Sequence, residues 1–209
     1  MQSLGEKLAI VILAAGASSR MRGADKLLQP IDGTPLLVLM ASRALQVTDQ
    51  VLVTLPCSPL GERRQQELSD LKRLTFVEVP DSERGMSRSF RSAIACIPSW
   101  VTTLLVLPGD MPDIMSDDMM RVACAIDPSS DKTIARGYGS DGTPGHPVAF
   151  AKPHFAELAL LDGDKGARDV LRTHARKVAK VILPGENATT DLDTPEAWAA
   201  WRAARGKPG

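Results

Sequence analysis

Runs of apolar residues alternate along most of the chain with longer segments of mixed polarity. The first run, Leu8 to Leu13 (LAIVIL), is continuous and rich in β-branched residues, which is typical of a strand covered on both faces. Six later runs also predict strands, and they span residues 51–55, 75–79, 103–107, 132–136, 147–151 and 178–183.

Helix signals occupy the segments between these runs. Thr34 followed by Pro35 predicts the N-cap and first residue of a helix, and Thr194 followed by Pro195 predicts the start of the last helix. Ser116 predicts the N-cap of a helix over residues 117–126. We expect further helices at 62–71, 85–97, 153–160 and 166–176, and a frayed tail at 205–209.

Strands that alternate with helices predict an α/β fold. We expect a three-layer α/β/α arrangement around a mainly parallel, Rossmann-like sheet. The length of 209 residues fits a single domain over residues 1–209. Ligands bind beyond the carboxyl ends of the strands in such sheets, so the residues that follow each strand are the first candidates for a functional site.

Composition and charge argue against several classes of protein. Hydrophobic residues make up 44% of the chain, enough for a core, and aromatic residues only 4%, so the core should be aliphatic. The 25 basic and 25 acidic residues cancel, which argues against nucleic-acid binding through bulk charge. No apolar run is long enough to cross a membrane, and the N-terminal MQSLGEK lacks the features of a secretory signal. We therefore expect a cytoplasmic protein without membrane contact.

Cysteine and histidine residues give weaker signals. Cys57, Cys96 and Cys124 are far apart and form no CxxC pair, so we expect buried, reduced thiols rather than a disulfide framework or a zinc site. His154 and His174 fall in predicted helices and are expected at the surface.

The loop after the first strand is the strongest candidate for an anion site. Ala14, Ala15 and Gly16 are small residues, which let backbone N–H groups approach an anion closely. Arg20 and Lys26 follow and can add positive charge. The ordinary alternative is a tight turn with surface cations, since the loop has neither the GxxxxGK[ST] nor the GxGxxG phosphate-binding pattern.

The fuller sequence of this loop resembles a known family signature. LAAGASSRMRGADK is similar to the LAAGxSxRMGxxK motif of nucleotidyltransferases with a glycosyltransferase-A-like fold, and most of all to that of molybdenum-cofactor cytidylyltransferases. Each later motif is weak alone, but the set follows the family's order over nearly the whole chain and is specific. These motifs are RGMSRS (84–89), LPGDMP (107–112), GHPVAF (145–150), GDKGAR (163–168) and DLDTPE (191–196).

Two positions depart from the family pattern. Arg22 intervenes before Gly23, where the family usually has glycine directly after the Arg-Met pair, and is expected to add a phosphate-facing cation. Met111 follows Asp110 where the family often has glutamine, so contacts on the pterin side are expected to differ.

The resemblance implies an enzyme, a nucleotidyltransferase that transfers CMP from CTP to the terminal phosphate of molybdenum cofactor (molybdopterin) and releases pyrophosphate. The implied metal is Mg²⁺, with Mn²⁺ as a substitute. Such a reaction needs positive charge to offset the repulsion between two phosphates, and little acid–base chemistry, because a phosphate monoester is largely ionised near neutral pH. The resemblance also implies a nucleotide-binding half (8–110), an acceptor half (111–209), and a molybdenum hydroxylase or its maturation chaperone as a partner.

Individual residues take roles by the same resemblance. Asp110 and Asp193 are the implied Mg²⁺ ligands, with Asp191 as the competitor of Asp193. Lys26, Arg20 and Asp110 are the implied catalytic residues. The implied binding residues are Leu13, Ala14, Ala15, Gly16, Gly85, Ser87 and Ser89 for the nucleotide, and His146 and Arg168 for the second substrate. Each type also has an ordinary alternative, namely a capping aspartate, a surface lysine or a structural histidine.

Two further expectations concern specificity. The methyl group of Ala15 leaves less room beside the base than the glycine of guanosine relatives, which carry LAGG, and so favours a pyrimidine. The glycine-rich segment from Gly137 to Gly145 is expected to form a mobile lid over a bulky pterin.

Three alternative functions use the same residues. The same fold could act with GTP or on another phosphate acceptor, such as a sugar phosphate, methylerythritol phosphate or lactyl phosphate. An NAD(P)H-dependent reductase would need no Mg²⁺, and the pair of Asp110 and Asp193 argues against it. A non-catalytic carrier of the molybdenum cofactor would turn over no nucleotide, and Lys26 and Asp110 argue against that function.

Overall fold

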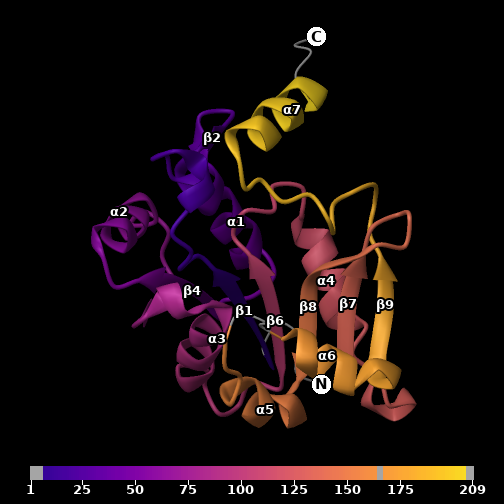
Figure 1. The fold of residues 1–209 in the computed structure, drawn as a ribbon. Coiled ribbons are helices and arrows are strands. Elements are labelled where there is room, and N and C mark those ends of the chain that lie inside the picture. Colours follow the sequence, from indigo (N-terminus) through magenta and orange to yellow (C-terminus); the bar gives the residue numbers. More distant parts are fainter. Residues whose placement is uncertain (1–6, 164–166, 206–209) are drawn as a thin grey trace.

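The computed structural model describes residues 7–163 and 167–205, and within them the chain builds a seven-stranded sheet with helices on both faces (Figure 1). Neighbouring strands follow the order β5-β4-β1-β6-β8-β7-β9. Among these strands β8 alone runs antiparallel to its neighbours, which confirms the predicted α/β fold with a mainly parallel sheet. The strands are β1 (Leu8–Leu13), β4 (Val51–Pro56), β5 (Leu74–Val79), β6 (Thr103–Pro108), β7 (Ile134–Tyr138), β8 (Pro144–Ala151) and β9 (Val178–Ile182).

The central strands are buried on both faces, as their continuous apolar sequences predict. On β1, Leu8, Ile10 and Ile12 pack into one hydrophobic cluster, while Ala9 and Val11 pack into a second cluster on the opposite face. The first cluster includes side chains of α1 (Leu36–Leu45) and α4 (Ser116–Cys124). The second includes side chains of α3 (Met86–Ala95), α5 (Phe155–Ala159) and α6 (Arg168–Thr173).

The loops at the carboxyl ends of β1 and β6 lie at one edge of this sheet. α7 (Pro195–Arg205) stands beyond that edge in Figure 1, beside a short hairpin of β2 (Pro30–Ile31) and β3 (Thr34–Pro35). α2 (Pro59–Glu67) lies beside β4. Because β8 runs in the opposite direction, it begins at the edge where the parallel strands end.

Two predicted helix starts are wrong, and in each case a different local interaction takes the place of the cap. Thr34 and Pro35 form strand β3, because Asp32 and Gly33 take positive φ angles and close a tight hairpin, so α1 starts one residue later. Ser116 is the first residue inside α4 rather than its N-cap.

The observed start of α4 depends on a carboxylate instead of the predicted hydroxyl. Asp118 accepts a hydrogen bond from the Met115 N–H at 3.1 Å. The Ser116 hydroxyl donates to the Arg43 carbonyl at 3.0 Å and so joins α4 to α1.

Other helix boundaries also differ from the predicted ones. α2 spans Pro59–Glu67, so it overlaps the predicted span of 62–71 but starts three residues earlier and ends four residues earlier. The helix predicted at 153–160 is split into a 3₁₀ turn, Lys152–His154, and α5. Residues 164–166, which contain the predicted start of the next helix, and residues 206–209 of the predicted tail lie outside the described residues.

The segment predicted as a glycine-rich loop from Gly137 to Gly145 is mostly a β-hairpin. Gly137 belongs to β7 and Gly145 to β8, so residues 139–143 alone connect the two strands. The Gly139 N–H donates to the Thr143 carbonyl at 2.8 Å and tightens the turn. Pairing within the sheet therefore replaces the expected lid.

Burial of the cysteines and of His154 also differs from the prediction. Cys57, Cys96 and Cys124 are free thiols, as expected, but all three are exposed. His154 is buried at 5% exposure rather than at the surface, because its ring, in the turn that follows β8, contacts Thr133 and His174. Across residues 7–163 and 167–205, no helix has the length and hydropathy needed to span a membrane.

Candidate functional site

Two cavities lie at the edge of the sheet where the parallel strands end. The large cavity has a volume of about 560 Å³ and is lined by residues that include Arg136, His146 and Arg168. The small cavity has a volume of about 250 Å³ and is lined by residues that include Ala15 and Gly85. The two cavities share four lining residues, which are Lys26, Met86, Pro108 and Asp110.

The small cavity brings together most of the residues predicted to bind the nucleotide. They come from the loop after β1 and from the start of α3, two segments that are distant in the sequence. Those that line it are Leu13, Ala15, Gly16, Gly85 and Ser89. Two of the predicted residues, Ala14 and Ser87, do not belong to the described residues that line this cavity. Ser87 is fully buried within α3, and the Ala14 N–H donates to the Thr54 hydroxyl at 3.1 Å.

A buried arginine holds the loop after β1 in place. Arg64, in α2, is fully buried, and its guanidinium donates hydrogen bonds to the carbonyl oxygens of Ala14 at 2.6 Å and Gly16 at 2.8 Å. It also donates to the Ser18 hydroxyl at 3.1 Å and to both Asp25 oxygens at 2.7 and 2.8 Å. Arginine suits this position because its planar group offers five donors in a fixed arrangement.

The partner carboxylate, Asp25, connects this arginine to the next functional residue. Burial raises the pKa of Asp25, but the hydrogen bonds and charge of Arg64 outweigh that effect and lower the pKa below its ordinary value. Asp25 also accepts a hydrogen bond from the Leu27 N–H at 3.0 Å and caps the 3₁₀ turn that begins with Lys26. Arg64 therefore fixes both the small-residue loop and the backbone of Lys26.

Lys26 lies between two carboxylates at the junction of the cavities. Its ammonium group contacts Asp110 and also lies 2.5 Å from an Asp193 oxygen. The other Asp193 oxygen lies 2.6 Å from Arg20. Burial lowers the pKa of Lys26, but the charges of Asp110 and Asp193 outweigh it and raise the pKa, so the lysine is fully protonated at neutral pH.

The acidic residues of this site have different charge environments. Burial raises the pKa of Asp193, but Lys26 and Arg20 outweigh that effect and lower it. The pKa of Asp191 is raised, by burial and by the neighbouring negative charges of Asp110 and Asp193. Asp193 is thus the better paired carboxylate, although both line the large cavity.

Asp110 and Asp193 suit a divalent cation. One ammonium group contacts both carboxylates, so their oxygens can also reach one small cation between them. Asp110 Oδ1 is buried and has no hydrogen-bond partner among the described residues. Such an oxygen is an available ligand, and carboxylate oxygens are the ligands that Mg²⁺ prefers.

The large cavity is also lined by basic side chains. Arg136, in β7, donates through Nε to the Gly145 carbonyl at 2.9 Å, and its guanidinium group carries further donors. Arg168 stands at the start of α6 and lines the same cavity. His146 lies with them, and burial, together with the charges of Arg136 and Arg168, lowers its pKa to about 4. These groups can bind an anion.

Sequence reasoning missed Arg64 and Arg136 and misplaced Arg22. Arg64 stands in a polar helix next to the exposed Arg63, and the sequence alone does not distinguish the two. Arg136 is the last residue of the predicted strand at 132–136. Ligands bind beyond the carboxyl ends of strands, so a basic residue at this position could have been recognised as a candidate. Arg22 was expected to face a phosphate, but it pairs with Glu196 of α7 at 2.5 Å and is exposed.

Comparisons with known proteins agree with this geometry. Residues 10–178 match the sequence profile of the MobA-like NTP transferase domain. The chain is 34% identical over 162 residues to the bifunctional protein GlmU of Novosphingobium aromaticivorans, an alignment that covers 76% of this chain and 32% of that protein. The chain therefore spans about a third of the length of this curated relative.

Two other relatives match over nearly their full length. The molybdenum cofactor guanylyltransferase of Shewanella frigidimarina is 26% identical over 190 residues, covering 89% of this chain and 91% of that protein. The crystal structure of Rv0371c of Mycobacterium tuberculosis in complex with manganese superposes with a TM-score of 0.75 at 27% identity, covering 93% of this chain and 97% of that one.

We predict that replacing Arg64 with methionine destabilises the protein by about 3–5 kcal/mol, because Asp25 is left buried and unpaired. Urea unfolding followed by circular dichroism measures this change. Arg63→Met is the matched control, since Arg63 is exposed on the same helix and its loss should cost about 0.5 kcal/mol or less. Equal unfolding midpoints for the two variants would contradict the assigned role of Arg64.

We also predict a pH dependence that depends on His146. Its pKa is about 4 in the folded protein, against 6.5 as the ordinary value, so the unfolded chain binds the proton more readily between these pH values. Stability should therefore fall as the pH drops from 6.5 to 4, by about 3 kcal/mol through this residue. His146→Gln should flatten the curve in that window, as measured by urea unfolding at several pH values. A curve of unchanged slope would refute the prediction.

Proposed function

The chain belongs to the MobA-like NTP transferase domain family, and on this premise we propose that it transfers CMP from CTP to the terminal phosphate of molybdenum cofactor, releasing pyrophosphate. The observation that carries the proposal is the meeting of two cavities at Lys26 and Asp110. A nucleotide in the small cavity and a phosphorylated acceptor in the large one would bring their phosphates together beside these charged groups.

The origin of the lining residues supports a division of labour within a single domain. All the described residues that line the small cavity lie between Leu13 and Asp110, which agrees with a nucleotide-binding half at 8–110. The large cavity adds residues from Met111 to Asp193, which agrees with an acceptor half at 111–209. Both halves contribute strands to the same seven-stranded sheet. The two substrate sites therefore belong to a single domain.

The chemistry that we propose is an in-line displacement at the α-phosphorus of CTP. An oxygen of the acceptor phosphate forms a bond to this phosphorus, and the bond to pyrophosphate breaks. No proton has to move, because the acceptor monoester is largely ionised near neutral pH. Lys26 and Arg20 offset the charge on the phosphates, and the raised pKa of Lys26 keeps its ammonium group protonated.

A divalent cation completes this proposal. Asp110 and Asp193 would hold Mg²⁺ or Mn²⁺, and the manganese complex of Rv0371c supports a metal in this family. Such a cation, when bound, supplies positive charge that offsets the repulsion between the two substrates. Asp191, beside the same carboxylates, is the alternative ligand.

The nucleotide preference rests on the small cavity. Ala15 is 5% exposed and lines this cavity, so its methyl group takes space beside the base and favours cytosine over guanine. GTP is the second candidate, because the relative from Shewanella frigidimarina is named a guanylyltransferase. That name also supports molybdenum cofactor as the acceptor.

The acceptor preference rests on the size and charge of the large cavity. Its volume of about 560 Å³ suits a bulky acceptor, and Arg136, His146 and Arg168 suit its phosphate. Delivery of the product to a molybdenum hydroxylase or its maturation chaperone, in the cytoplasm, belongs to the same proposal. A reductase using NAD(P)H is the weaker alternative, since hydride transfer has no need of the paired Asp110 and Asp193.

We predict that purified protein incubated with molybdenum cofactor and Mg²⁺ forms a cytosine dinucleotide from CTP and no dinucleotide from GTP, ATP or UTP. Mass spectrometry of the pterin product measures the outcome. A guanine dinucleotide would overturn the base preference and keep the reaction. A folded protein that forms no product with any nucleotide would overturn the acceptor, and sugar phosphates would be tested next.

We predict that Asp110→Asn lowers turnover by about 100-fold or more, because it removes a preorganised charge from the junction of the cavities. Lys26→Ala should also lower turnover, and this loss should be far larger than its change in melting temperature can explain. Asp117→Asn is the control, since Asp117 lies in the first turn of α4, outside both cavities as described. An Asp110→Asn enzyme with normal turnover and normal Mg²⁺ demand would rule out the metal role.

A further inference from the structure

A second group of metal-ligating side chains lies at the opposite end of the sheet from the junction of the two cavities. His154 ends the 3₁₀ turn after β8, Glu157 is in α5, and His174 follows α6. The end of β8, Ala151, pairs with Thr103 at the beginning of β6, whereas Asp110, where the two cavities meet, follows the end of β6. In Figure 1, α5 and α6 accordingly lie at the far end of the sheet from α7.

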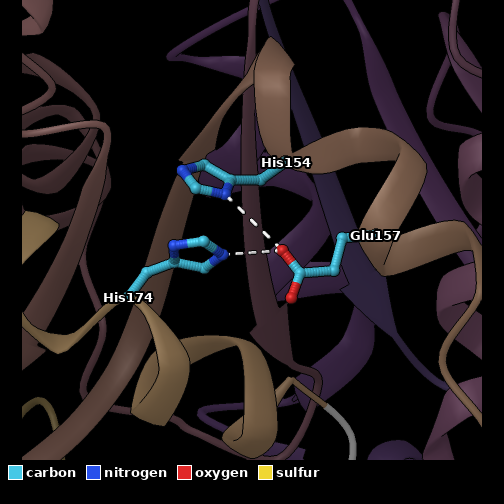
Figure 2. A group of neighbouring side chains, drawn as sticks. All are labelled: His154, Glu157 and His174. Carbon is cyan, nitrogen blue, oxygen red and sulfur yellow. Dashed lines mark hydrogen bonds and ion pairs between the residues drawn. The ribbon is translucent and has the colours of Figure 1, made fainter.

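The three side chains converge on one point (Figure 2). Glu157 Oε2 lies 2.8 Å from His174 Nε2 and 3.9 Å from His154 Nδ1. The two imidazole rings meet edge to face, with their centroids 4.7 Å apart. One ligand atom from each residue lies within 4.8 Å of the other two.

The buried histidine is arranged as metal-ligating histidines usually are. His154 Nε2 lies 2.9 Å from the Thr133 hydroxyl, which fixes the ring and leaves Nδ1 facing Glu157 and His174. Imidazole nitrogens are the commonest metal ligands in proteins, and this site offers two of them.

We propose that His154, Glu157 and His174 bind a transition-metal ion, with Zn²⁺ as the best match to two imidazoles and one carboxylate. Ligands in a tetrahedral zinc site lie about 3.3–3.6 Å from one another, given zinc–ligand bonds of about 2.0–2.2 Å. Binding therefore needs small shifts in both directions: the Glu157–His174 distance of 2.8 Å must lengthen, and the widest spacing, 4.8 Å at most, must shorten by about an ångström. Glu157 and His174 can supply these shifts, because their side chains are 41% and 25% exposed.

This site differs from the carboxylate site at the cavities in chemistry and in consequence. Imidazole nitrogen selects zinc-like metals, whereas Asp110 and Asp193 offer oxygen alone and suit Mg²⁺. A metal here would join α5 to the end of α6, and the first residue of α6 is Arg168, which lines the large cavity. The ion would thus hold in place the helix that presents a cation to the acceptor.

Cobalt and zinc titrations of the full-length, tag-free protein test the proposal. With excess Mg²⁺ present to occupy the carboxylate site, we expect one equivalent of Co²⁺ to bind with visible d–d absorption and no thiolate charge-transfer band. Zn²⁺ should displace it and raise the melting temperature, because it binds the folded state. His174→Ala and Glu157→Gln should each weaken binding by about 100-fold or more, since loss of even an outer partner of a ligand costs 10–100-fold.

Matched controls separate this site from others on the chain. Asp169→Asn, on α6 and paired with Arg172, should bind Co²⁺ as the unmodified protein does. Replacing the exposed thiols of Cys57, Cys96 and Cys124 with serine should also leave binding unchanged. Absence of binding at micromolar Co²⁺ would overturn the proposal. Binding that survives in both His174→Ala and Glu157→Gln, or is lost with the thiols, would overturn it too.

Discussion

The guanidinium group of Arg64 is the constraint on which the candidate site depends. A loop of small residues has no side chains large enough to fix its own path, and this loop obtains its path from a helix about 40 residues further along the chain. The arginine binds the carbonyl oxygens of Ala14 and Gly16 and orients Asp25. Asp25 in turn caps the 3₁₀ turn that begins with Lys26, so the arginine also positions the backbone of this lysine. Burial of the Arg64–Asp25 pair is costly unless every donor is satisfied, and the fixed arrangement of the loop satisfies them.

Charge at the junction of the cavities is balanced locally rather than over the whole surface. Lys26, Asp110 and Asp193 come from the loops after β1 and β6 and from the segment before α7, and the parallel strands bring the first two together. The net charge of zero therefore hides a dense cluster of paired charges within the site. The large cavity is lined by the carboxylates of Asp110 and Asp193 and also by Arg136 and Arg168, an arrangement suited to a metal ion and an anionic substrate.

The sequence predicted the sheet well because its strands are continuous apolar runs that leave few other options. Helix starts were less predictable, since a cap signal such as Thr34-Pro35 competes with the Asp32-Gly33 hairpin, and only the tertiary structure decides between them. Most predicted nucleotide-side residues line the small cavity because they follow strand ends. Arg64 and His154 were not predictable, because their roles arise from burial of polar side chains against distant segments, and the local sequence carries no sign of it.

The direction of β8 has a consequence for how specificity can change during evolution. Since β8 begins where the parallel strands end, a hairpin of only five residues, 139–143, enters the rim of the large cavity. Surface hairpins tolerate insertions at little cost in closure entropy, while the paired strands behind them keep their register. A lineage could therefore reshape the acceptor side by altering the length of this turn, and leave untouched the loops that hold the nucleotide.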